Sequence, residues 1–281
     1  MKNITEIKRK LEKYFAKKYC GIDDINLCPK GNECTCKVVA EIRAYIETII
    51  PSGFKDVTIK DFIGRDLKGN KILNDEITIS AKKKLLSFCW EGVSLKDISG
   101  PNQLKDQELS QLSIMDKRKN KASNVVVYAG SSINTGGGSG KTLIASLIMK
   151  EAIKRRSFPG NYSDSYDWVD FNRLKQSIIQ DDRQYGVGYS GLVDTRYCNW
   201  LVIDDIPSQF SSSPNSKMFL SSVLDPFISE RVESKLSTIF VFCFDIIKQS
   251  LDVEKSFGIS IAKIIKDPKT CIISLNNGDN S

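Results

Sequence analysis

The 281-residue sequence predicts an α/β fold in which five parallel strands form one sheet, preceded by a small helical region with a cysteine cluster. Three observations predict this organisation. After residue 123, five short apolar runs alternate with helical or polar segments, as buried strands of a parallel sheet do. A glycine-rich segment follows the first run and leads directly into an apolar helix. Half of the eight cysteines lie between Cys20 and Cys36.

Two helices are expected before the sheet begins. Apolar side chains recur at helical spacing along residues 3–18, with lysines on the opposite face. A second helix is expected over residues 36–50, and it should end before Pro51 because the residue preceding a proline disfavours helical backbone. A third helix is expected at residues 81–90, inside a long mixed segment whose role the sequence does not explain.

The strands expected in the α/β part are short and almost wholly apolar. They cover residues 124–129, 168–171, 200–204, 238–244 and 271–275. Continuous apolar runs are typical of strands buried on both faces, and alternation with helices predicts parallel pairing. We therefore divide the chain into an N-terminal domain of residues 1–50 and an α/β domain of residues 51–281.

Composition restricts the class of protein. The formal net charge of +7 suits a polyanionic partner such as a nucleic acid. No apolar run approaches the roughly 18 residues of a membrane span, and the N-terminus lacks the apolar block of a secretory signal. We therefore expect a cytoplasmic protein without a membrane partner, whose cysteines are reduced or bind metal. The absence of histidine excludes a histidine general base, a Ser-His-Asp triad and any histidine metal ligand.

The segment TGGGSGKT, residues 135–142, is nearly a phosphate-binding loop of the pattern G-x-x-x-x-G-K-[ST]. Only the first glycine is replaced, by Thr135. A strand precedes the loop and an apolar helix follows it, so backbone N–H groups and the positive helix end would face the phosphates of a nucleotide. The residues expected to surround these phosphates are Gly136, Gly137, Gly138, Ser139, Gly140, Lys141 and Thr142. Lys141 would contact the β- and γ-phosphates of ATP, and Thr142 would bind Mg²⁺.

A second part of a nucleotide site is predicted in NWLVIDDI, residues 199–206. Two aspartates follow four apolar residues, which places Asp204 and Asp205 at the carboxyl end of a buried strand, where ligands of α/β proteins bind. Asp204 would hold Mg²⁺ through its water shell. Asp205 would orient the water that attacks the γ-phosphate. Together with the phosphate loop, the pair predicts a Mg²⁺-dependent ATPase.

Several segments, taken in order, resemble the DnaC/DnaI-type replicative helicase loaders and their IstB-like relatives, which are AAA+ ATPases. The resemblance covers residues 50–275. The similar segments are IPSGFKDVTIKDF (50–62), the phosphate loop with GKTLIASLI (140–148), YDWVDFNRLKQSI (166–178), LVIDDI (201–206) and LSSVLDPFISERVESKLSTIFVF (220–242). It implies an AAA+ core that assembles with copies of itself in the presence of ATP.

The resemblance also assigns roles to single residues. Arg231 matches the arginine that acts on the nucleotide of a neighbouring subunit. Lys263 lies nearest to the arginine of the sensor-2 helix, displaced by one position. The sensor strand departs from the family, because VFCFD places Cys243 or Asp245 near the usual asparagine. This departure favours reduced hydrolysis.

The cysteine cluster has the spacing Cys20-x₇-Cys28-x₅-Cys34-x-Cys36. Four thiolates form a closed tetrahedral zinc site, and a chain without histidine must build such a site from cysteine alone. We therefore expect Zn²⁺ in a small domain that recognises a partner protein, with an Fe–S cluster as the less favoured alternative. The DnaI-type loaders likewise carry zinc in an N-terminal partner domain.

The function predicted from these features is the ATP-dependent loading of a hexameric replicative helicase onto single-stranded DNA. Two alternatives remain open at this point. One is an IstB-like helper ATPase that binds DNA and a transposase. The other is an adaptor that binds nucleotide and hardly hydrolyses it.

Overall fold

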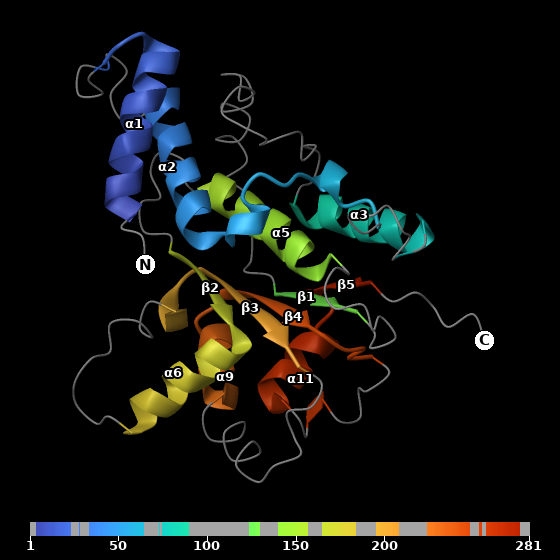
Figure 1. The fold of residues 1–281 in the computed structure, drawn as a ribbon. Helices are drawn as coiled ribbons and strands as arrows, with labels where there is room; N and C mark the ends of the chain where they lie inside the picture. Colours follow the sequence, from blue (N-terminus) through green and yellow to red (C-terminus); the bar gives the residue numbers. More distant parts are fainter. Residues whose placement is uncertain are drawn as a thin grey trace.

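The structure is a computed structural model whose centre is one parallel five-stranded sheet in the order β2-β3-β4-β1-β5 (Figure 1). The residues that it describes are 4–23, 28, 34–64, 73, 75–89, 124–129, 140–156, 165–183, 195–207, 224–247, 253–254 and 257–275. The strands are β1 (Val125–Tyr128), β2 (Tyr166–Asp170), β3 (Trp200–Ile206), β4 (Ser237–Phe242) and β5 (Cys271–Ser274). This sheet confirms the predicted α/β fold class.

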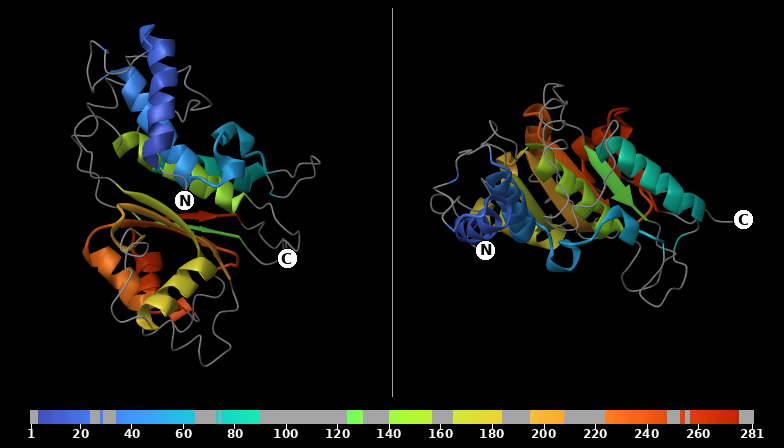
Figure 2. Two further views of the ribbon diagram at one scale, coloured as in Figure 1. Left: turned by 60° about the vertical axis from the view of Figure 1, so that its left-hand side comes forward. Right: turned by 90° about the horizontal axis from the view of Figure 1, so that it is seen from above.

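Helices cover both faces of the sheet. The helices are α1 (Ile4–Cys20), α2 (Thr35–Ile49), α3 (Asp75–Cys89), α5 (Lys141–Arg156), α6 (Phe171–Arg183), α9 (Asp225–Glu233) and α11 (Ile259–Lys266). Two short 3₁₀ turns, η3 (Ser52–Phe54) and η4 (Ile59–Asp61), follow α2. Figures 1 and 2 show α2, α3 and α5 on one face and α6, α9 and α11 on the other. None of the described helices is long and apolar enough to cross a membrane.

Alternation along the strands explains the two apolar layers. In β1, Val125 and Val127 belong to the layer under α5, whereas Val126 and Tyr128 belong to the layer over α9 and α11. Successive strand residues point to opposite faces, so a strand covered on both sides is apolar throughout. β1 is accordingly an interior strand, next to the edge strand β5, with Val125 paired to Ile239 of β4 and to Cys271 of β5.

Helix α2 contributes residues both to the cysteine cluster and to the α/β core. Its first turn carries Cys36, which packs with Phe15 of α1 in a small apolar cluster. Its later turns are buried in the main layer above the sheet, and Tyr45 meets the ring of Tyr166 on β2 at a centroid distance of 5.2 Å. The domain boundary expected at residue 50 therefore follows a helix whose apolar face is shared with the α/β core, and it stays a prediction.

Helix α3 gives part of the mixed segment a structural role. It begins six residues earlier than expected, at Asp75, and Ala81 and Leu85 are buried in the main layer. Lys84 donates a hydrogen bond of 2.9 Å to the carbonyl of Ile272 on β5. The helix thus covers the sheet next to its edge strand. The remainder of the segment, residues 90–123, lies outside the described residues.

Four strands, β1, β2, β4 and β5, end one or two residues earlier than the sequence predicts, and local contacts account for the ends of β2 and β4. Phe171 starts α6 instead of ending β2, because the Asp170 carboxylate accepts hydrogen bonds from the backbone N–H groups of Asn172 and Arg173. Such a bond is the usual way to satisfy the first donors of a helix. β4 ends at Phe242, and the chain bends at Cys243 and Phe244. That bend directs Cys243 toward the end of β3.

Candidate nucleotide site and cysteine cluster

The last residue of the glycine-rich loop turns the chain into α5. Gly140 has φ +83°, and a Cβ atom there would lie 2.6 Å from the ring of Phe62. Both facts require glycine, because L-residues avoid this dihedral and the ring leaves no space. Lys141 is the first residue of α5, at the positive helix end. The predicted phosphate ligands Gly136, Gly137, Gly138 and Ser139 lie outside the described residues.

Thr142 and Asp204, the two predicted magnesium ligands, lie near each other. The hydroxyl of Thr142 is close enough to the Asp204 carboxylate, near the end of β3, to lower its pKa. Burial raises the pKa of Asp204, and the nearby carboxylates of Asp205 and Asp170 raise it further, against the Thr142 hydroxyl and a hydrogen bond from the Asp205 backbone. Three carboxylates therefore crowd one strand end, and a bound cation would offset their repulsion.

Asp205 is held in an unusual backbone conformation beside Cys243. Its φ is +63°, in the left-handed region that aspartate enters more readily than most residues. The Cys243 thiol donates to Asp205 Oδ1 at 2.9 Å. Burial, together with this hydrogen bond, raises the pKa of Cys243 to about 12, although Lys141 acts in the opposite direction. Cys243 thus stays a neutral donor and fixes the carboxylate of Asp205.

The register between β3 and β4 explains how these groups meet. Pairing is regular from Trp200 to Ile203 and then shifts, so that Ile206 pairs with Phe242. The bulge contains both aspartates, and β-bulges re-aim side chains at the ends of strands. Lys141, Thr142, Asp204 and Asp205 therefore converge at one edge of the sheet, which is an arrangement suited to a phosphate group and a divalent cation.

Arg231 is enclosed within the α/β core. Only 1% of its surface is exposed, and its guanidinium group is surrounded by oxygen acceptors. It donates hydrogen bonds to Thr238 Oγ1 and to the backbone carbonyls of Thr195, Arg196, Cys198 and Ser237. A side chain enclosed in this way joins the start of β3 to the start of β4. Its role at the nucleotide of a neighbouring subunit stays a prediction.

Lys263 is not brought to the site by any contact between described residues. It is exposed on α11, which covers the face of the sheet opposite α5. Its predicted contact with nucleotide stays a prediction.

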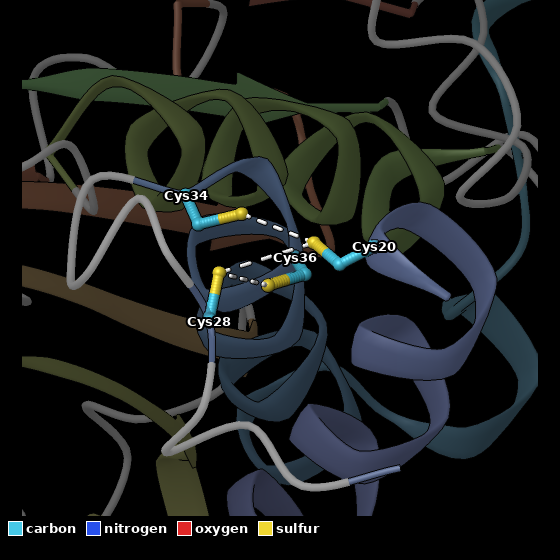
Figure 3. A group of neighbouring side chains, drawn as sticks. All are labelled: Cys20, Cys28, Cys34 and Cys36. Atoms are coloured by element: carbon cyan, nitrogen blue, oxygen red, sulfur yellow. Dashed lines mark hydrogen bonds between the residues drawn. The ribbon is translucent and has the colours of Figure 1, made fainter. Parts of the chain in front are cut away.

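The four cysteines of the N-terminal region do converge (Figure 3). Cys20 ends α1, Cys34 is the residue before α2, Cys36 lies in its first turn, and Cys28 comes from the connection between the helices. All four sulfur atoms lie within 4.8 Å of one another. The contacts are 3.9 Å for Cys20–Cys28, 3.3 Å for Cys20–Cys34 and 4.0 Å for Cys28–Cys36.

These distances fit a tetrahedral metal site. Zn–S bonds of about 2.3 Å place the four sulfurs of such a site about 3.8 Å apart. Burial tends to raise the pKa of Cys34, but hydrogen bonds from the Cys36 backbone and the neighbouring thiols outweigh it and lower that pKa to about 7. The cluster can therefore hold a metal ion such as zinc without rearrangement of the helices.

Two residues of the candidate nucleotide site were not assigned roles from the sequence. Phe62 ends the segment IPSGFKDVTIKDF, and no local pattern indicates that its ring covers Gly140. The sequence marks Cys243 only as a departure from the family. Its place directly after an apolar strand is the signal that could have assigned it to the site.

No protein-family model and no curated protein matches the chain. Among solved structures, it is similar to the DnaC helicase loader, with 17% identity and a TM-score of 0.42 over 62% of this chain and 90% of that one. It is also similar to DnaI, with 15% identity and a TM-score of 0.47 over 84% of this chain and 100% of that one.

A further similar structure is AMPPCP-bound DnaA from Aquifex aeolicus, with 13% identity and a TM-score of 0.37 over 59% of this chain and 44% of that one. At these identities and TM-scores, similarity alone does not say what this chain does. The two loaders that the sequence motifs resemble, DnaC and DnaI, are thus among the solved structures to which the chain is similar.

Proposed function

We propose that this chain is an AAA+-type ATPase of the cytoplasm that loads a replicative helicase onto single-stranded DNA. The observation that carries the ATPase part is the convergence of Lys141 and Thr142, at the start of α5, with Asp204 and Asp205, near the end of β3. These residues come from motifs more than sixty positions apart, and a nucleotide site of this kind needs them together.

In this proposal each residue of the site has a separate role at a bound nucleotide. Lys141 and the backbone N–H groups at the start of α5 hold the phosphates, because that helix end carries positive charge. Thr142 and Asp204 would hold Mg²⁺, which supplies charge neutralisation at the phosphates. Asp205 orients the attacking water, and the Cys243 thiol keeps its carboxylate in place through the 2.9 Å hydrogen bond.

The loader part rests on the sequence segments that resemble the DnaC/DnaI-type proteins. In this proposal the α1–α2 hairpin, stabilised by zinc at its four cysteines, recognises the hexameric helicase. Copies of the chain associate through their ATPase parts. Arg231 is buried in the single chain, where it stabilises the fold.

A second candidate function is favoured by one observation. Arg231, the residue predicted to promote hydrolysis at a subunit interface, is enclosed within its own chain. A protein of this kind would bind ATP as a structural ligand and turn it over very slowly. It would act as an adaptor between the helicase and other proteins.

ATP turnover separates these functions. The purified chain is assayed with Mg²⁺–ATP alone, with single-stranded DNA and with double-stranded DNA, and Lys141→Ala serves as the inactive control. A loader is expected to show turnover that single strands stimulate more than duplex. Tight nucleotide binding with turnover no higher than that of Lys141→Ala would favour the adaptor. Stimulation by duplex alone would contradict the loader and favour a helper of transposition.

A further inference from the structure

Helix α1 carries a strongly basic surface that has no role in the candidate sites. Its inner face is occupied, because Phe15 and Ala16 are buried against α2 and Leu11 and Tyr19 pack beside them. Its outer half presents Glu6, Arg9, Lys10, Lys13, Tyr14, Lys17 and Lys18, which we call the α1 face. Figures 1 and 2 show α1 at the periphery of the molecule.

The charge of the α1 face is nearly of one sign. Five of its seven residues are basic and one is acidic. The acidic residue, Glu6, pairs with Lys10 at 2.7 Å, and Lys17 pairs with Asp23 at 3.3 Å. Among the described residues, Arg9 and Lys13 have no ion-pair partner. A face of this kind attracts a polyanion.

An aromatic ring stands among these cations. Tyr14 is 57% exposed, although large apolar rings are usually covered. One side of the ring is fixed by an edge-to-face contact with Phe15 at a centroid distance of 5.1 Å, and Lys18 Nζ lies 5.9 Å from its centroid. The ring is therefore held in place while much of it remains open to a ligand.

We propose that the α1 face binds single-stranded nucleic acid, with a base stacked on Tyr14 and phosphates contacted by Arg9 and Lys13. Cations interleaved with an exposed aromatic ring are the combination that single-strand sites use, because every base has a face that stacks. Duplex DNA keeps its bases stacked inside and offers none to Tyr14. An acidic protein surface would match the charge but leave the fixed ring unexplained.

The dimensions of the face suit a short stretch of strand. From Arg9 to Lys17 the helix rises about 12 Å at 1.5 Å per residue. A single strand is more extended than a strand of duplex, whose phosphates rise about 3.4 Å each, so only a few phosphates pass along the face. The affinity of one such face is modest, and assembly of several chains on one strand would multiply it.

The inference depends on the proposed function only in the choice of a single strand as ligand. It is therefore tested without nucleotide, where binding and ATP turnover are independent readouts. The full-length, zinc-containing protein is titrated into fluorescein-labelled oligo(dT) and into a labelled duplex, and anisotropy is followed between about 50 and 200 mM salt. The variants are Arg9→Gln/Lys13→Gln, Tyr14→Ala and Tyr14→Phe.

Each variant has its own expected result. Arg9→Gln/Lys13→Gln should lower the slope of log K against log salt by about 1.4, which is about 0.7 for each lost phosphate contact. Tyr14→Ala should weaken binding roughly fivefold to 150-fold at every salt concentration with the slope unchanged, and Tyr14→Phe should bind like the wild type. The matched control, Lys266→Gln/Lys269→Gln, removes the same charge near α11 and should leave the slope unchanged.

Two results would overturn the proposal. One is wild-type oligo(dT) binding by both Arg9→Gln/Lys13→Gln and Tyr14→Ala, which would assign the face to an acidic protein surface. The other is an equal slope change in the α11 control, which would show that only total charge matters. Zinc content and circular dichroism of each variant establish that α1 is still folded, since all substituted side chains are exposed.

Discussion

The cysteine cluster and the phosphate-loop edge of the sheet each gather four functional side chains, but the cores beneath them differ greatly in size. Around the cysteines, the buried residues other than the thiols are Phe15, Val39 and Ala40. The four polar residues of the nucleotide site, Lys141, Thr142, Asp204 and Asp205, stand at the rim of two broad apolar layers, and none of the four belongs to either layer. The same kind of convergence therefore rests on different physical support.

The difference teaches which residues serve the fold and which serve only a ligand. In a small helix pair, the metal ligands are also the core, so the loss of metal removes most of the stabilising free energy. In the sheet, burial of the strands already stabilises the fold, so the site residues are free to be polar and even unfavourably charged. Substitutions should reveal this contrast as a series of decreasing effects on the free energy of unfolding.

The largest effect is expected for Cys34→Ser. The variant should lose its metal and unfold α1 and the first turn of α2, because structural zinc contributes on the order of 10 kcal/mol or more to the folding of such units. The later turns of α2 should stay packed in the main layer. Elemental analysis of zinc and hydrogen exchange of residues 4–23 measure the two losses. Cys271→Ser, outside the cluster, is the matched control and should keep about one zinc per chain. If the wild type contained no metal and its residues 4–23 were still protected from hydrogen exchange, the contrast between the two sites would be wrong.

A smaller but still large effect is expected for Arg231→Met. The substitution keeps the apolar stem and leaves several buried carbonyls without a donor, which should destabilise the α/β core by about 3–5 kcal/mol. Urea unfolding measures it. Arg196→Met is the control, because Arg196 is partly exposed and its pair with Glu230 spans 3.4 Å, so that its loss should change stability by about 1 kcal/mol or less. If Arg231→Met lost ATP turnover at unchanged stability, the result would support the predicted role of Arg231 at the nucleotide of a neighbouring subunit.

An intermediate effect is expected for Gly140→Ala. Its positive φ disfavours a Cβ by about 1–2 kcal/mol, and the Phe62 ring must also move. Thermal unfolding and ATP affinity are measured together, and both should fall. Gly53→Ala is the matched control, since an added Cβ there meets nothing within 4 Å. Equal behaviour of the two alanine variants would mean that the approach of Phe62 does not constrain the loop.

The smallest effect on stability is expected for Lys141→Ala, which should change the free energy of unfolding by about 0.5 kcal/mol or less. ATP binding or turnover should nevertheless be lost, because Lys141 supplies the side-chain charge at the phosphates. Nucleotide binding by fluorescence and unfolding by urea separate the two properties. Wild-type ATP affinity and turnover in this variant would remove the basis of the ATPase proposal.

The sequence predicted the sheet and part of the site for local reasons. Each strand is an apolar run. Asp204 stands near the end of one such strand and Thr142 begins the helix that follows another, so parallel pairing predicts that the two residues lie at the same edge of the sheet. The environment of Arg231 could not be predicted, because its acceptors come from two strand ends that only the folded sheet brings together. The place of α3 beside the sheet could not be predicted for a similar reason. Its amphipathic pattern indicates that one face is buried, but it does not indicate which part of the molecule covers that face.

The shared helix α2 has a mechanical consequence. A helix of 15 residues is a rod about 22 Å long, and this one is anchored at one end by Cys36 and along the rest by Ile42 and Ile46. No hinge interrupts it between the two anchorages. A force on the hairpin is therefore transmitted to β2 through the contact between Tyr45 and Tyr166. Because β2 pairs with β3, the same force reaches the strand that carries Asp204 and Asp205 near its end.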